Sequence, residues 1–362
     1  MNIYEELKVR PFINARGIYT RFGGTIMPEA VVAAMAEASR QFVNLFELQD
    51  RMGEAIARMT QNEAAFVSCG AASGILLAIA GCIAGTNEES ANRLPDTQGM
   101  RNQVIMQLCD CGTECDAAIR AAGGKIVHVG VQDRRTNVEK FLDAINEQTA
   151  AIVLLAFGSD GDSWGRRIVE GARQKNIPVL VDGAYSVPPK ENLWRYTRDV
   201  GVDALITSGG KGIHGPQPTG LVLGKRTIIE GCKFHASPNV RIGRGMKVGK
   251  EEFAGVYTAL KLFLSKDVDG QNQLKEKQIA HIREQVKDIS GVKLRMEGSQ
   301  LHIDLDSEIA DKIMEELLQN DPSILLSGRG KRMMVQSSVL QPGEEQIVGQ
   351  HLRRTLERNL RQ

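Results

Sequence analysis

The chain has 362 residues, which is enough to bury a large core and to form two domains. Its formal net charge of +1 gives no overall field to attract nucleic acid or an acidic membrane, and its 42% hydrophobic and 25% charged residues are ordinary for a globular protein. No apolar stretch is long enough to span a bilayer, and the start of the chain lacks a basic-then-apolar signal segment. We therefore expect a cytoplasmic protein without nucleic-acid or membrane partners.

The first 45 residues predict an arm followed by a helix. Residues 11–14 are extended in composition, two glycines at 23–24 turn the chain, and residues 27–40 favour a helix. A further helix is expected over 47–60, where apolar residues recur at helical spacing. We take this arm and helix, 1–45, as the first segment of the chain.

Strands and helices alternate from residue 64 onward. Strands are expected at 64–68, 103–108, 125–129, 151–157, 177–182, 204–207 and 220–223, with helices at 70–84, 117–122, 138–145 and 164–175 and an exposed loop at 86–101. Continuous apolar strands separated by helices are typical of a mainly parallel sheet that is buried on both faces. The prediction is an α/β domain over 46–250, built on such a sheet.

The character of the sequence changes after about residue 250. An apolar-rich helix at 253–264 is followed by a charged helix at 273–287, short strands at 292–296, 302–305 and 332–336, a helix at 310–318 and a closing helix from 343. This mixture predicts a smaller α+β domain over 251–362.

A lysine set among glycines is the most informative feature of the sequence. Lys211 lies in Ser-Gly-Gly-Lys-Gly, residues 208–212, directly after an apolar run. Burial at the end of a strand favours the neutral amine, so we expect Lys211 to have a lowered pKa and to be nucleophilic. Such an amine condenses with an aldehyde, and pyridoxal 5′-phosphate (PLP) is the usual one. Asp182 ends the strand at 177–182 and is suited to keep the pyridine nitrogen of that cofactor protonated.

Three further features accompany these two residues. Residues 69–74, Cys-Gly-Ala-Ala-Ser-Gly, turn from a strand into a helix, where free backbone N–H groups bind an anion; a purely structural turn has the same composition. Ser208 is either a phosphate ligand or a turn former, and His214 either lines the site or caps its loop. Since 69–74 is not the dinucleotide motif G-x-G-x-x-G, the sequence argues against a nicotinamide enzyme.

Two clusters of polar residues admit more than one interpretation. Four cations stand among glycines and suit either a solvated face or a clamp for phosphate or carboxylate: Arg241, Arg244, Lys247 and Lys250. Three cysteines have C-x-C-x3-C spacing: Cys109, Cys111 and Cys115. Because no fourth ligand follows at a customary interval, we expect no metal site. The six cysteines predict no disulfide framework in a chain of this length.

Four segments together carry a resemblance to a known family: 181–184 (Val-Asp-Gly-Ala), 208–212, 215–220 (Gly-Pro-Gln-Pro-Thr-Gly) and 243–251 (Gly-Arg-Gly-Met-Lys-Val-Gly-Lys-Glu). They resemble the selenocysteine synthase-like group of fold-type I PLP enzymes. The likeness is greatest to the bacterial branch that includes D-glucosaminate-6-phosphate ammonia-lyase, to which 12–17 and 117–124 are also similar. It extends from about residue 10 to residue 260 and more loosely to the end.

The resemblance implies roles for particular residues. Lys211 would form the Schiff base with the cofactor, and Asp182 would contact its pyridinium nitrogen. The remaining cofactor contacts would come from Gly70, Ala71, Ala72, Ser73, Cys111, Ser208 and Gln217. In this group Gln217 and the segment of Arg244 and Lys247 tend to face a neighbouring subunit's site, which implies a homodimer or a larger homo-oligomer with shared active sites.

One departure from the family pattern bears on the reaction. Relatives tend to place a histidine that stacks on the cofactor within 109–116, and here Cys111 stands near that place. Substrate contacts are expected from Arg241, Arg244, Lys247 and His214.

The function that we expect is a PLP-dependent lyase, which removes ammonia by α,β-elimination from a small amino acid or a phosphorylated amino sugar acid and gives a 2-keto acid. An aminotransferase, a racemase or a β-replacement enzyme would share the first proton removal by Lys211, so the motifs leave these open. The missing histidine also leaves open a PLP-binding protein without catalysis. Selenium transfer onto tRNA is disfavoured, because the chain is nearly neutral and has no basic extension.

Overall fold

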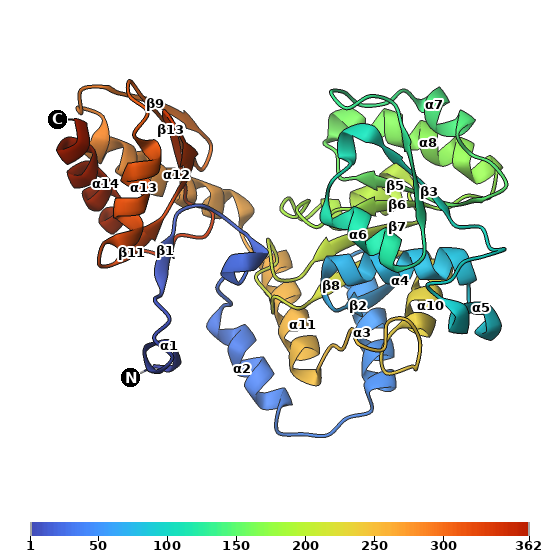
Figure 1. Ribbon diagram of the computed structural model, residues 1–362. Coiled ribbons are helices and arrows are strands. Elements are labelled where there is room, and N and C mark those ends of the chain that lie inside the picture. Colours follow the sequence, from blue (N-terminus) through green and yellow to red (C-terminus); the bar gives the residue numbers. More distant parts are fainter. Residues whose placement is uncertain (1, 361–362) are drawn as a thin grey trace. The chain divides into compact units, whose positions relative to one another are not determined.

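The computed structural model describes residues 2–360, which form two compact units (Figure 1). The larger unit is Gly24–Ser265, and the smaller unit joins Met1–Gly23 to Lys266–Gln362. The arm expected at 1–45 is thus divided at Gly23. Helix α11 (Lys250–Ser265), expected at the start of the small domain, belongs to the larger unit.

A seven-stranded sheet forms the centre of the larger unit. Its strands are β2 (Ala64–Ser68), β3 (Gln103–Gln107), β4 (Lys125–Val129), β5 (Thr149–Leu155), β6 (Val179–Asp182), β7 (Ala204–Ser208) and β8 (Gly220–Gly224), in the spatial order β2-β8-β7-β6-β5-β3-β4. Within this sheet β8 is antiparallel to both neighbours and every other pairing is parallel. Six strands therefore end at the same edge of the sheet, and the predicted mainly parallel architecture is confirmed.

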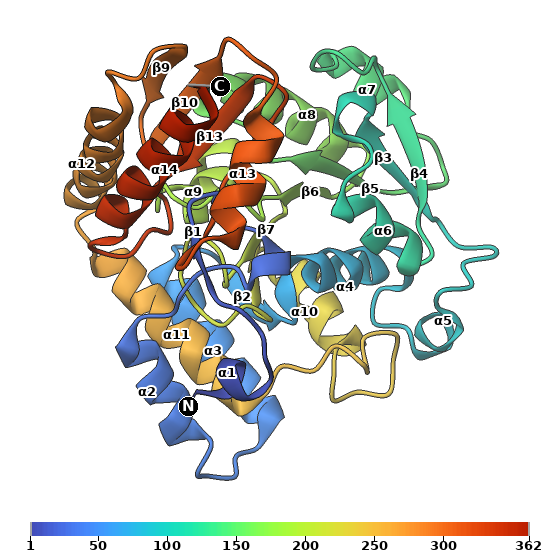
Figure 2. The ribbon, with the colours of Figure 1, turned by 60° about the vertical axis from the view of Figure 1, so that its left-hand side comes forward.

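Helices cover both faces of this sheet. One face packs against α4 (Gly70–Ala84), α6 (Glu114–Ala121) and α10 (Arg226–His235); the other packs against α3 (Leu45–Met59), α7 (Val138–Asp143), α8 (Asp162–Gln174) and α11. Successive strand residues serve opposite faces, so Leu180 of β6 packs with the first group and Val181 with the second. Helix α2 (Glu29–Ala38) lies beside α11 in both views (Figures 1 and 2).

Short turns and helices complete the larger unit: η2 (Leu108–Asp110), η3 (Ser159–Gly161), α9 (Asn192–Trp194) and the π-helical turn η4 (Arg195–Val200). The loop expected at 86–101 is wrong in part, because it contains α5 (Glu88–Arg93), which Asn87 caps by accepting from the N–H of Ser90. The sequence also gave no expectation of α10, whose Ile229 and Cys232 pack with α4 in the core.

The smaller unit is an α+β domain. A four-stranded antiparallel sheet has the order β12-β13-β10-β9, from β9 (Val292–Glu297), β10 (Gln300–Leu305), β12 (Ser327–Arg329) and β13 (Arg332–Gln336). Helices α12 (Val268–Val286), α13 (Ala310–Gln319) and α14 (Glu344–Leu360) accompany it, with α12 beside α14 (Figure 2). From the N-terminal segment, which also holds α1 (Ile3–Glu6) and η1 (Thr20–Phe22), β1 (Phe12–Asn14) pairs in parallel with β11 (Ser323–Leu325). None of the described helices is both long and apolar enough to cross a bilayer.

Candidate active site

The sheet brings the predicted lysine, aspartate and anion-binding turn to one edge. Ser68 at the end of β2 and Ser208 at the end of β7 both pair with Gly220, the first residue of β8. Asp182 ends β6, the strand next to β7. Ligands of parallel α/β sheets bind beyond these carboxyl ends, so this edge of the sheet is the candidate active site.

The loop that carries Lys211 is closely packed around its glycines. A Cβ on Gly210 would lie 2.4 Å from the Cα of Gln217, and one on Gly212 would lie 1.9 Å from the carbonyl oxygen of Val187. Both contacts are with backbone, so only glycine fits at these two positions. The hydroxyl of Thr25 lies 3.2 Å from the carbonyl oxygen of Gly210 and 3.3 Å from that of Lys211. The backbone on either side of Lys211 is therefore fixed.

The Lys211 side chain is half-buried, and its surroundings favour the neutral amine. Burial is the largest effect and holds the pKa of Lys211 below its ordinary value, against the opposing attraction of Asp182 and Glu114. The Nζ atom lies 3.1 Å from the centroid of the Tyr185 ring. Lys211 is thus no solvated turn lysine, and a lowered pKa is what a nucleophilic amine requires.

Asp182 presents a carboxylate from a mostly buried position. Its Oδ1 accepts a hydrogen bond from the backbone N–H of Ala184 at 3.1 Å. Burial raises the pKa of Asp182, while the Ala184 bond, the charge of Lys211 and a side-chain hydrogen bond from Cys115 oppose that rise. A cationic ring nitrogen beside this carboxylate would compensate its burial, which is the partnership that a pyridine cofactor needs.

The turn from β2 into α4 fits an anion. Gly70 has a φ of 80°, and a Cβ placed on it would meet nothing within 4 Å. No side chain caps the helix at Cys69, so the first-turn N–H groups are available to a ligand. Ser68 donates to the carbonyl of Gly70 at 2.8 Å and steadies the turn. In this first turn Ala71 is buried, Ser73 half-buried and Ala72 exposed.

These residues together fit PLP. The α4 N-terminus suits its phosphate, Asp182 its ring nitrogen and Lys211 its aldehyde. Ser208 is buried beside Gly220, next to the same turn. His214, with a φ of 59°, donates its backbone N–H to the carbonyl of Lys211 at 2.9 Å. Gln217 is exposed, and Cys111 is half-buried just after η2.

The basic run divides into two groups in the structure. The Arg241 side chain has three partners within the larger unit. Its guanidinium lies 3.0 Å from the carboxylate of Glu88 in α5, donates a hydrogen bond to Asn92 and lies 4.7 Å from the ring centroid of Phe234. Arg244 and Lys247 instead line a cavity of about 320 Å³ that also touches Ser68 and Cys69. Among the predicted cations, these two are the ones that lie beside the strand-to-helix turn.

The cysteine cluster is not arranged for a metal. Within residues 2–360, no group of three or more histidine, cysteine or acidic side chains is disposed to hold an ion. Cys115 is fully buried, and its thiol bonds to the Asp182 carboxylate. Cys109 instead lies against Asp110, with Sγ and Oδ1 3.6 Å apart.

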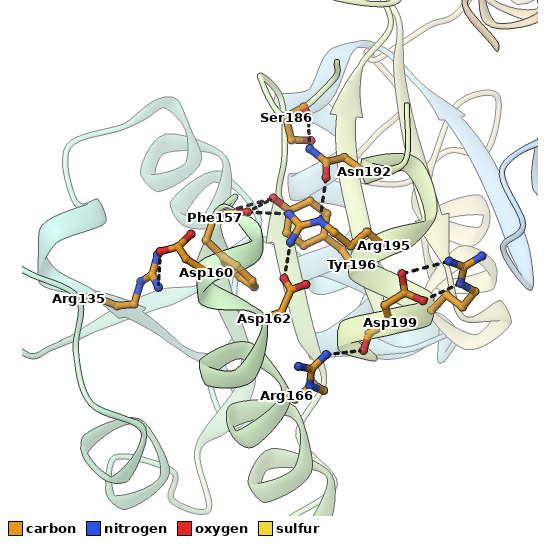
Figure 3. A network of polar contacts seen from close by, with 11 residues as sticks. Arg135, Phe157, Asp160, Asp162, Arg166, Ser186, Asn192, Arg195, Tyr196 and Asp199 are labelled. Carbon is orange, nitrogen blue, oxygen red and sulfur yellow. Dashed lines mark hydrogen bonds and ion pairs between the residues drawn. The ribbon is translucent and has the colours of Figure 1, made fainter. Parts of the chain in front are cut away.

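A polar network holds the loops after β5 and β6 (Figure 3). Arg195 donates to the carbonyl of Phe157 at 2.7 Å and to Asn192 at 2.8 Å, and it forms a mostly buried ion pair with Asp162. The Tyr196 hydroxyl also donates to the Phe157 carbonyl, at 2.7 Å. Arg195 therefore links the loop after β5, which precedes Asp182 in the sequence, to the loop after β6, which follows it.

Sequence reasoning missed the contacts that three residues make with the predicted ones. Tyr185 and Thr25 contact the Lys211 loop, and Cys115, which the sequence marked only as part of a cysteine cluster, bonds to Asp182. For Tyr185 alone a signal existed, because it follows Asp182 by three residues within one short loop. Arg195 was also missed, and it holds the loop after β6 through Asn192.

Comparisons with known proteins agree with this geometry. Residues 12–315 match the SelA family, described as L-seryl-tRNA selenium transferase. The chain belongs to this family. The D-glucosaminate-6-phosphate ammonia lyase of Salmonella typhimurium is 31% identical over 297 residues, which are 80% of this chain and 77% of that protein. A 5′-C-glycyluridine monooxygenase-decarboxylase of a Streptomyces species is 30% identical over 71% of this chain and 64% of its own length.

A solved structure of D-glucosaminate-6-phosphate ammonia-lyase shares the whole fold. It superposes with a TM-score of 0.84 at 25% identity and covers 99% of both chains. The predicted family, the fold-type I architecture and the PLP cofactor are confirmed, and the chain is a PLP-dependent enzyme of the ammonia-lyase type.

Proposed function

We propose that this enzyme eliminates ammonia from D-glucosaminate-6-phosphate or a closely related phosphorylated amino sugar acid and releases a 2-keto acid. The observation that carries the proposal is the likeness to ammonia-lyase over the whole fold, at a TM-score of 0.84, together with 31% sequence identity to the Salmonella enzyme. The edge of the sheet supports the chemistry, since it presents a half-buried lysine, a buried carboxylate and an uncapped helix N-terminus.

Lys211 is the residue to which we assign the proton transfer. Bound PLP supplies an electron sink for the bond to the α-carbon. Nζ of Lys211 would take the α-proton, because burial lowers the pKa of this amine and so favours its neutral form. The β-hydroxyl would leave as water with the proton that Lys211 has taken, and hydrolysis of the resulting unsaturated amine would give ammonia and the 2-keto acid. Asp182 would hold the ring-nitrogen proton throughout.

The remaining predicted residues are assigned to binding. Cofactor contacts are proposed for Gly70, Ala71, Ala72, Ser73, Cys111, Ser208 and Gln217. Arg244 and Lys247 would hold the phosphate of the substrate, because both line the cavity beside Ser68 and neither guanidinium nor ammonium is buried. His214 would line the site. Arg241 is proposed as a weaker substrate contact, since Glu88 already binds it.

The finer properties of the protein are part of the same proposal. We propose a cytoplasmic homodimer or larger homo-oligomer whose subunits share active sites, with a small-molecule substrate and no nucleic-acid partner. Two exposed apolar side chains, Phe42 just before α3 and Phe46 in its first turn, suit such an assembly. A gel-shift experiment with tRNA at low salt should detect no complex, and light scattering should give a mass of two or more chains.

The test is an assay of ammonia and 2-keto acid with D-glucosaminate-6-phosphate and no added amino acceptor. Equal amounts of both products are expected, and Lys211→Ala should lose activity by about a thousandfold or more. Lys261→Ala, at an exposed lysine of α11, is the matched control and should retain full activity. Keto acid formation only with an added acceptor would instead indicate an aminotransferase. A fully active Lys211→Ala enzyme would refute the mechanism.

A further inference from the structure

Tyr185 and Lys211 meet from two separate loops. Tyr185 lies in the loop after β6, three residues beyond Asp182, and Lys211 lies in the loop after β7. Nζ lies 3.1 Å from the ring centroid, well within the roughly 6 Å over which an aromatic face attracts a cation. The ring is 59% exposed, so it stands at the surface of the site and not in the core.

The loop of Tyr185 is held by several hydrogen bonds. Ser186 donates its hydroxyl to the carbonyl of Gly183 at 2.8 Å and its N–H to the same oxygen at 2.9 Å. Its own carbonyl accepts from Asn192 at 2.6 Å, and Asn192 accepts from Arg195 at 2.8 Å (Figure 3). These bonds hold the backbone of the loop that carries Tyr185.

The two loops also fit each other closely beside this contact. A Cβ on Gly212 would lie 1.9 Å from the carbonyl oxygen of Val187. Gly212 follows Lys211 and Val187 follows Ser186, so the backbones approach next to the amine and the ring. The packing leaves little freedom for one loop to slide past the other.

Charged groups around the amine act together with the ring. Asp182 from β6 and Glu114 from α6 both favour the protonated form of Lys211, and burial opposes them and is the largest effect. His214 lies in the same loop as Lys211, and its backbone N–H donates a hydrogen bond to the carbonyl oxygen of Lys211. An aromatic face adds a third attraction for the ammonium form and requires no further negative charge.

We propose that Tyr185 is a positioning residue for Lys211: its ring face holds the amine at the aldehyde-binding place before the cofactor arrives. The proposal rests on the role of Lys211 in the proposed function, and assigns to Tyr185 an action through the lysine only. The ring restricts where Nζ lies and stabilises its protonated form, so it should set both the rate and the pH midpoint of cofactor capture. The phenol hydroxyl has no part in this effect.

The experiment measures the rate at which cofactor-free protein captures added PLP, from the visible absorbance of the lysine-bound cofactor across pH. Tyr185→Leu removes the ring face. We expect the pH midpoint of PLP capture to be about half a pH unit lower in Tyr185→Leu than in the wild type. At high pH, where Lys211 is neutral in both proteins, capture by the variant should be about threefold slower. Tyr185→Phe retains the face and should match the wild type in both properties.

Two controls complete the design. Tyr257→Leu removes a tyrosine whose ring also faces a lysine, with Lys261 Nζ 5.6 Å from its centroid in α11, and should leave both properties unchanged. Lys211→Ala should form no covalently bound cofactor after borohydride treatment. Thermal unfolding of each protein shows whether a variant has folded, and capture is compared only at temperatures where all are native.

Three outcomes would overturn the proposal. An unchanged Tyr185→Leu profile would show that the ring does not act on Lys211. Equal changes in Tyr185→Phe and Tyr185→Leu would assign the effect to the hydroxyl, and an equal change in Tyr257→Leu would make it nonspecific. Normal capture without ammonia release would leave the role of Tyr185 intact and refute only the lyase reaction, so the two proposals can fail separately.

Discussion

Two loops at the same edge of the sheet differ in how tightly they are built. In the Lys211 loop, added Cβ atoms on Gly210 and Gly212 would lie within 2.4 Å of other backbone atoms. In the segment 109–116, a Cβ on Gly112 would meet nothing within 4 Å. The first loop carries Lys211, and the second carries Cys111, near the place where the family resemblance led us to expect a histidine.

The second segment is nevertheless anchored at both ends. Asp110 accepts from Gln107 at 3.0 Å, and Cys115 is fully buried against Asp182. Only its middle, around Cys111 and Gly112, is open. The difference indicates that the backbone is most tightly packed around Lys211, for which we propose the covalent chemistry, while the segment around Cys111 has room for other side chains.

The largest effect is expected when one methyl group is added to the close-packed Lys211 loop. Gly212→Ala would drive a Cβ into the carbonyl of Val187, and we expect a loss of roughly 3 kcal/mol in unfolding free energy, the upper end for overpacking. Cofactor capture should fall with it, because Lys211 is the preceding residue. Urea unfolding and PLP absorbance measure the two effects.

Gly245→Ala is the matched control for that change. A Cβ there meets nothing within 4 Å, and Gly245 does not have a positive φ. Its stability should change by less than about 0.5 kcal/mol. If Gly212→Ala behaved like this control, the loop would be far more adaptable than its contacts indicate.

A smaller effect on stability, with a large one on activity, is expected for Asp182→Asn. Since burial raises the pKa of Asp182 above its ordinary 3.8, the folded state binds more protons than the unfolded state between these two values. Stability therefore falls as pH rises through that window, and the cost remains at pH 7. Asparagine removes it, so the cofactor-free variant should be more stable than wild type at pH 7.

The same substitution should reduce lyase activity by about a hundredfold or more, because the ring-nitrogen proton loses its carboxylate partner. Unfolding at pH 7 and at pH 4 checks the sign: the advantage of Asp182→Asn should shrink at the lower pH. Asp160→Asn, at an exposed carboxylate near the same edge, should change neither property. A variant less stable than wild type at pH 7 would contradict the assigned cost of burial.

Sequence predicted most of what depends on local pattern. Strands 64–68 and 125–129 and helix 70–84 have the predicted bounds, because glycine or polar residues border each of these segments. Lys211 and Asp182 were predicted because Asp182 ends one apolar strand and Lys211 lies in the glycine-rich loop after another. The roles of individual binding residues stay predictions.

Contacts between distant segments escaped prediction for a physical reason. Arg241 belongs to a basic run, but its partner Glu88 lies on α5, a short helix in a stretch that reads as loop. Arg195 binds Phe157 and Asp162 across more than 30 residues of sequence, and no periodicity signals that meeting. Such side chains are determined by which loops converge, which is a property of the folded sheet.

The smallest effect is expected for a substitution in the open segment around Cys111 and Gly112. Cys111→His introduces the residue type that the family resemblance led us to expect near this place, where a Cβ on the neighbouring Gly112 would meet nothing within 4 Å. Stability should change by less than about 0.5 kcal/mol, and stacking of an added ring on the cofactor should slow PLP release by about two- to tenfold. Release is measured by absorbance after dilution into excess phosphate. Cys109→His, beside the anchored Asp110, is the control and should not slow release. Faster release from Cys111→His would mean that the segment is closed to a larger side chain and that its cysteine is required there.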